Sequence, residues 1–119
     1  MTNKSKTIFL DIDGTIFKHY GNVIAQLKNP VDVLDGVKEK LIEWDHKNYN
    51  IILTTGRRES SRSETQKQLE EAGIFYDQLI MGLGGGERVV INDFKPNSTE
   101  PTASAICLTR NAGLKEVEI

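Results

Sequence analysis

Three short, β-prone apolar runs constrain the fold of this chain more than any other feature. They lie at residues 7–10, 51–53 and 89–91, and each ends at polar residues. Continuous runs of this length are typical of strands that are buried on both faces of a sheet. The sequence therefore predicts three clear strands, with weaker candidates at residues 78–81 and 105–108.

Helical patterns separate the first strands. Apolar residues recur near helical spacing from about Asp35 to about Lys47, with charged residues between them. A polar helix is predicted after Arg57, to about Ala72, and Gly73 closes it. Strands that alternate with helices predict an α/β fold, a three-layer Rossmann-like parallel sheet with helices on both faces. Ligands of such sheets bind at the carboxyl ends of the strands.

Length and charge restrict the function classes. The 119 residues fit one domain, residues 1–119, because a domain takes roughly 150 residues. Lys and Arg total 15 against 17 Asp and Glu, and the net charge of -2 disfavours a surface that coats nucleic acid or a membrane. Cys107 is the single cysteine, so no internal disulfide can form, and we expect it to be buried in a strand. A short, weakly apolar N-terminus and the lack of a membrane-length apolar segment predict a cytoplasmic protein.

Polar residues follow the predicted strands. Asp11 and Asp13 are two residues apart at the end of the first run, so their side chains project to the same side of an extended backbone. Two carboxylates this close repel each other unless a cation binds or one is protonated. Mg²⁺ is the simplest cation, since it prefers oxygen ligands, and Asp93 after the third run supplies a third carboxylate.

The residues after the second run offer hydrogen-bond donors instead of negatively charged carboxylates. Thr55 offers a hydroxyl donor and Gly56 allows close approach of the backbone, while the predicted helix start presents free N–H groups. A phosphoryl group between a metal and this turn would be neutralised from both sides. With an aspartate beside it as nucleophile, the predicted chemistry is phosphoryl transfer through an aspartyl-phosphate.

These motifs resemble those of the haloacid dehalogenase superfamily of phosphatases. The sequence DIDGT at residues 11–15 looks like its first motif, LTTGR at residues 53–57 like its second, and VIND at residues 90–93 like its fourth. The order and spacing match from about residue 7 to about residue 108. The resemblance implies that Asp11 is the nucleophile and Asp13 the general acid and then base. It also implies that the side chains of Asp11 and Asp93 and the carbonyl of Asp13 hold Mg²⁺, and that Thr55 rather than Thr54 binds the phosphoryl oxygens.

One motif departs from the family pattern. The third motif of the family is a Lys or Arg that neutralises the nucleophile and the phosphate, and no lysine stands directly before residue 89. Arg88 is the nearest candidate, with Lys67 and Lys95 as alternatives. The stretches at residues 15–35 and 73–89 are too short for a large cap domain, which implies an open site or one that a neighbouring subunit of a homo-oligomer covers. The sequence NDFKP at residues 92–96 is similar to that of capsule or polysaccharide biosynthesis phosphatases.

The leading hypothesis is a Mg²⁺-dependent phosphomonoesterase acting on a small phosphorylated metabolite such as a sugar phosphate. A polynucleotide 3'-phosphatase would use the cluster of Arg57, Arg58 and Arg62, but the acidic pI of 5.7 disfavours it, and these arginines are more typical of a solvated helix face. A non-enzymatic, receiver-like phosphoacceptor would need an Asp after the weak strand at residues 78–81, and this sequence has none there. An inactive binding domain would explain the missing lysine. His19 and His46 are expected to be surface or packing residues.

Overall fold

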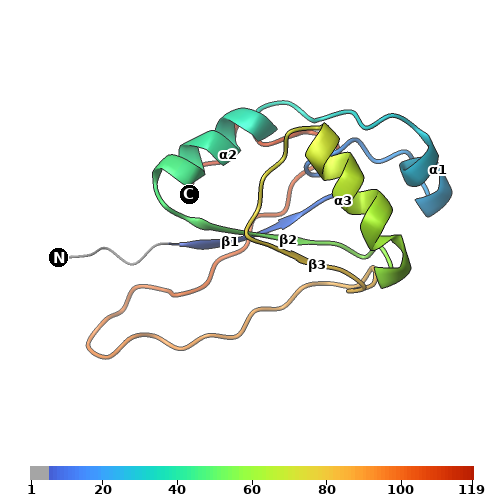
Figure 1. Ribbon diagram of the computed structural model, residues 1–119. Coiled ribbons are helices and arrows are strands. Elements are labelled where there is room, and N and C mark those ends of the chain that lie inside the picture. Colours follow the sequence, from blue (N-terminus) through green and yellow to red (C-terminus); the bar gives the residue numbers. More distant parts are fainter. Residues whose placement is uncertain (1–5) are drawn as a thin grey trace.

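The computed structural model describes residues 6–119 (Figure 1). It confirms the strands predicted first and second, both predicted helices and the weak strand near residue 80, and it adds a short helix, α1, that periodicity did not indicate. None of the helices between residues 6 and 119 is long and apolar enough to cross a membrane. In chain order the elements are β1 (Thr7–Asp11), α1 (Val23–Lys28), α2 (Val37–His46), β2 (Asn50–Thr54), a 3-10 turn η1 (Glu59–Ser61), α3 (Arg62–Glu71) and β3 (Gln78–Ile80).

The three strands form one parallel sheet in the order β1-β2-β3. Asp11 at the end of β1 is level with Thr54 of β2, and Thr54 is level with Ile80 of β3. All three strands therefore end at the same edge of the sheet. The residues that follow β1 and β2 in the chain, which carry the predicted chemistry, meet along this edge.

The helices cover one side of the sheet only. Figure 1 shows α1, α2 and α3 on the same side of the three strands, whereas the sequence predicted helices on both faces. The strand order explains the difference, because each new strand adds on the same side of the previous one. Right-handed crossovers in a constant direction place both α2 and α3 on the same face.

The hydrophobic core lies between this helix layer and the sheet. The strands contribute Leu10, Ile51 and Leu53, and α2 contributes Trp44, all of which are buried. The C-terminal residues also take part, although they form no helix or strand in the described chain. The buried residues of this core that follow residue 68 are Leu69, Ala72, Ile74, Leu79, Met81, Leu114 and Val117.

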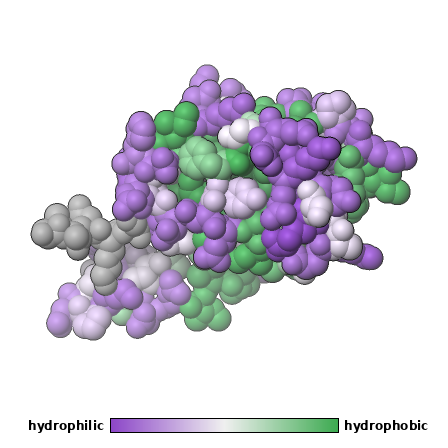
Figure 2. Space-filling model, viewed as in Figure 1, coloured by the Kyte–Doolittle hydropathy of each residue, from purple (hydrophilic) through white to green (hydrophobic). Residues whose placement is uncertain are grey.

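Residues 82–110, which we call the 82–110 segment, form a long exposed excursion without helix or strand. The predicted strands at residues 89–91 and 105–108 are therefore wrong. Val89 and Ile91 remain 72% and 89% exposed. Figure 2 shows green hydrophobic surface among polar residues at the lower edge of the molecule. Strand preference depends on pairing and packing partners, and this segment has no sheet partner in the described chain. Cys107 is exposed for the same reason, contrary to the expectation that it is buried.

Candidate active site

The first part of the site is the turn after β1. Leu10 and Ile12 point into the core, so Asp11 between them faces away from the helices. The carbonyl of Ile12 accepts the backbone N–H groups of residues 15, 16 and 17 at 3.2, 2.8 and 3.0 Å, which closes the turn. Gly14 adopts a φ of 92°, and a Cβ there would lie 3.2 Å from Cγ of Arg110. Glycine thus allows both the turn and the close approach of the C-terminal segment.

The pKa of the Asp11 carboxyl group is raised above its ordinary value. The atoms packed around its carboxyl group raise its pKa above 3.8, and the charge of Asp13 raises it further. The backbone N–H of Ile12 lowers the pKa, as do the nearby charges of Arg88 and His19. Within residues 6–119 the Asp11 carboxylate forms no salt bridge. The charge of Arg88 thus acts on a carboxylate with which Arg88 forms no salt bridge.

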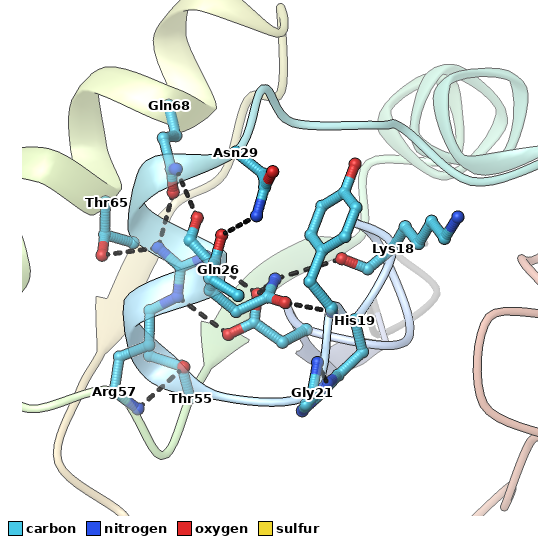
Figure 3. Close-up of polar contacts among 12 residues, drawn as sticks. Lys18, His19, Gly21, Gln26, Asn29, Thr55, Arg57, Thr65 and Gln68 are labelled. Carbon is cyan, nitrogen blue, oxygen red and sulfur yellow. Dashed lines mark hydrogen bonds and ion pairs between the residues drawn. The ribbon is translucent and has the colours of Figure 1, made fainter.

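Asp13 has a different environment. Arg57 donates two hydrogen bonds to the Asp13 carboxylate, from Nε to Oδ2 and from Nη2 to Oδ1, each 2.8 Å long. Gln26 of α1 donates a third, from Nε2 to Oδ1 at 2.7 Å. The remaining nitrogen of the Arg57 guanidinium, Nη1, donates to Thr65 Oγ1 at 3.0 Å and to Gln68 Oε1 at 2.6 Å (Figure 3). Asp13 is thus fixed by the turn after β2, by α1 and, through Arg57, by α3.

Thr55 begins the turn after β2. Its side chain is buried, and its hydroxyl accepts the backbone N–H of Arg57 at 3.0 Å. Its own N–H donates to the carbonyl of Ile80 at 3.0 Å, and its carbonyl accepts the N–H of Leu83 at 3.1 Å. The predicted helix does not start directly after Thr55, because three residues and then η1 intervene before α3. The positive end of α3 is therefore farther from the turn than the sequence predicted.

Arg88 reaches this turn through Gly84. A Cβ on Gly56 would lie 2.7 Å from the carbonyl oxygen of Gly84, so only glycine permits this approach. Arg88 Nη2 donates to the same oxygen at 3.0 Å, and Nη1 donates to the carbonyl of Gly86 at 2.6 Å. The structure therefore brings Gly56 and Arg88 together, and the charge of Arg88 lowers the pKa of Asp11.

The two alternative cations are placed differently. Lys67 lies on α3 with 77% of its side chain exposed, and it approaches Glu71 at 4.0 Å. Lys95 is exposed on the 82–110 segment. Of the three predicted cations, Arg88 is the one that the described contacts link to the turn after β2.

The predicted third carboxylate does not join the other two. Asp93 is exposed on the 82–110 segment, where its backbone carbonyl accepts the hydroxyl of Thr102 at 2.5 Å. No group of three His, Cys, Asp or Glu side chains suited to a metal ion occurs among residues 6–119. The physical reason is that residues 89–91 do not pair with the sheet, so Asp93, which follows them, does not lie at the carboxyl ends of the strands.

The remaining donors can still fit Mg²⁺. Asp11 has a carboxylate without a salt-bridge partner in the described chain, and no backbone N–H of that part donates to the carbonyl of Asp13. Protein sites commonly hold Mg²⁺ with one or two carboxylates, waters and substrate phosphate oxygens. The carboxylate of Asp13 is less suited, because Arg57 and Gln26 already occupy it.

Several residues of the site escaped the sequence analysis. Gln26, Thr65 and Gln68 carry no recognisable motif, and Arg57 is buried rather than on a solvated helix face. The position of Arg57 directly after the Thr55-Gly56 turn was the one available signal, since that turn meets the end of β1. Arg62 pairs with Glu59 at 2.9 Å. The arginines therefore form no common cationic patch for a polynucleotide.

Comparisons with known proteins inform the fold alone. No family model matches the chain, and no curated protein matches it significantly. A crystal structure of a protein from Vibrio cholerae, a structural-genomics target, is similar with a TM-score of 0.53 and 19% sequence identity. The match covers 73% of this chain and 79% of that one. The chain therefore shares an α/β fold with that protein.

Proposed function

We propose that this protein is a Mg²⁺-dependent phosphomonoesterase that works through an aspartyl-phosphate. The observation that carries the proposal is the surroundings of Asp11. Its carboxylate has no salt-bridge partner within residues 6–119, yet the charge of Arg88 acts to lower its pKa. A nucleophile that must meet a phosphoryl dianion needs this combination of a free carboxylate and nearby positive charge.

The residues around Asp11 supply the other parts of the reaction. An oxygen of Asp11 attacks phosphorus, while Asp13 gives a proton to the oxygen of the leaving alcohol. Asp13 then takes a proton from the water that releases phosphate from Asp11. The hydroxyl of Thr55 accepts a hydrogen bond from the backbone N–H of Arg57 and donates its own proton to a phosphoryl oxygen. Arg88 and the backbone at Gly56 contribute further donors beside it.

Mg²⁺ would be held by the carboxylate of Asp11 and the carbonyl of Asp13, with waters and substrate oxygens completing its shell. When bound, it would neutralise charge on the transferring phosphoryl group. The similarity of residues 11–15 and 53–57 to the haloacid dehalogenase motifs supports the same assignment. A small phosphorylated metabolite such as a sugar phosphate is the proposed substrate class, with a role in polysaccharide biosynthesis. The pairing of Arg62 with Glu59 and the burial of Arg57 weigh against a polynucleotide substrate.

The test is hydrolysis of p-nitrophenyl phosphate with Mg²⁺. Asp11→Asn should lower kcat by roughly 10³-fold or more, because the amide cannot act as nucleophile. Asp45→Asn is the matched control, since Asp45 is exposed on α2, and it should leave turnover unchanged. Undiminished turnover by Asp11→Asn would refute the covalent route.

A further inference from the structure

Arg57 is the most deeply buried charged side chain among residues 6–119, with 4% of its surface exposed. A guanidinium is excluded from water at a high cost unless its N–H groups are paired. Arg57 meets this requirement with four side-chain hydrogen bonds, two of which go to Asp13. The fork of two parallel bonds fixes the plane of the Asp13 carboxylate as well as its position.

The two oxygens of Asp13 are not equivalent. Oδ1 accepts two hydrogen bonds, from Arg57 Nη2 at 2.8 Å and from Gln26 Nε2 at 2.7 Å. Oδ2 accepts only the bond from Arg57 Nε at 2.8 Å. Since a carboxylate oxygen accepts about two such bonds, Oδ1 is filled and Oδ2 keeps a free lone pair. The Asp13 side chain keeps 14% of its surface exposed.

A closed ring of hydrogen bonds holds this arrangement. Gln68 accepts from Arg57 Nη1 at 2.6 Å and donates from Nε2 to the backbone carbonyl of Gln26 at 2.9 Å. The side chain of Gln26 returns to Asp13 and also donates to the carbonyl of Lys18 at 3.1 Å (Figure 3). The ring joins the turns after β1 and β2 to α1 and α3, and rotation of the Asp13 carboxylate breaks its bonds to Arg57 and Gln26.

The geometry points to Arg57 and Gln26 as positioning residues that hold Asp13 so that Oδ2 is the atom that exchanges the catalytic proton. This inference rests on the proposed phosphatase function. As an oxygen of Asp11 bonds to phosphorus, the bond from phosphorus to the leaving oxygen breaks, and that oxygen takes the proton from Oδ2. In the second step the oxygen of water bonds to phosphorus, its proton passes to Oδ2, and the bond to Asp11 breaks.

The test compares a substrate that needs the acid with one that does not. Glycerol phosphate has a poor leaving group, whereas the nitrophenolate of p-nitrophenyl phosphate leaves without a proton. Arg57→Lys keeps the charge but loses the fork, so kcat/KM, which reports transfer of the phosphoryl group to Asp11, should fall about 10 to 100-fold more on glycerol phosphate than on the aryl ester. Gln26→Met should show the same preference and leaves Arg57 in place, which guards against a folding defect.

Two controls separate positioning from structure. Arg62→Lys, on an arginine that bonds to Glu59 and to the carbonyl of Leu79, should leave both kcat values unchanged. Adding Arg57→Lys to Asp13→Asn should not lower kcat further than Asp13→Asn alone, because the first acts through the second.

The outcomes against this inference are distinct from failure of the proposed function. Equal losses of kcat/KM on both esters in Arg57→Lys and Gln26→Met, or losses that multiply with those of Asp13→Asn, would assign Arg57 and Gln26 a purely structural role. In that case the wild type would still release phosphate through Asp11. A wild-type protein that hydrolyses neither ester would overturn the phosphatase proposal itself, and the positioning role with it.

Discussion

Asp11 and Asp13 are two residues apart, yet the structure treats their carboxylates in opposite ways. Asp13 accepts three hydrogen bonds from Arg57 and Gln26, whereas Asp11 has no salt-bridge partner among the described residues and carries a raised pKa. Two like carboxylates with different surroundings can take different roles in one reaction. The contrast supports Asp11 as the group that reacts and Asp13 as the group that moves protons.

The raised pKa of Asp11 predicts a pH-dependent stability difference. The folded protein binds the Asp11 proton more tightly than the unfolded chain does, so this proton stabilises the fold below the ordinary value of 3.8, and the contribution is lost as pH rises through the folded pKa. Asp11→Asn should therefore have a larger free energy of unfolding than the wild type at neutral pH without Mg²⁺. The gap should close as the pH falls toward 3.8.

Urea unfolding of both proteins at several pH values measures this gap. A variant that is less stable than the wild type at neutral pH, or a gap that does not change with pH, would contradict the desolvation of Asp11. Asp45→Asn serves again as the control, because Asp45 is exposed.

At the scale of elements, the chain contains two kinds of apolar run. Leu53 of β2 is fully buried, whereas Ile91 of the 82–110 segment is 89% exposed. Leu53→Ala should lower the free energy of unfolding by about 2–5 kcal/mol, since it leaves a cavity in the core. Ile91→Ala should change it by less than about 0.5 kcal/mol, as expected for an exposed site. Denaturant unfolding of the two variants decides whether residues 89–91 pack as the structure shows, and a cost for Ile91→Ala comparable to that for Leu53→Ala would show that they do not.

The α1 helix is held by side chains rather than by an apolar stripe. It has six residues, and the side chain of Asn22 caps it by accepting the N–H of Ala25 at 2.9 Å. Helices this short are marginal in isolation. Gln26 anchors α1, because its side chain bonds to Asp13 and its carbonyl accepts from Gln68. Hydrophobic periodicity does not detect such a helix.

For the whole molecule, the sequence predicted what depends on local pattern. The alternation of strands and helices was correct as far as β3, and so was the meeting of the ends of β1 and β2. Whether residues 89–91 form a strand, and where Asp93 lies, depends on pairing with a distant strand, which the local sequence cannot specify. The burial of Leu114 and the bonds of Arg57 to Asp13 likewise depend on contacts between distant parts of the chain.

The central claim is that Asp11 becomes phosphorylated during turnover. The direct measurement is mass spectrometry of peptides from protein that was acid-quenched during turnover of p-nitrophenyl phosphate with Mg²⁺. We expect a hydroxylamine-sensitive phosphoryl adduct on the peptide that contains Asp11. It should accumulate in Asp13→Asn, which lacks the base for the second step. An active protein without this adduct, or with the phosphoryl group on another residue, would contradict the account.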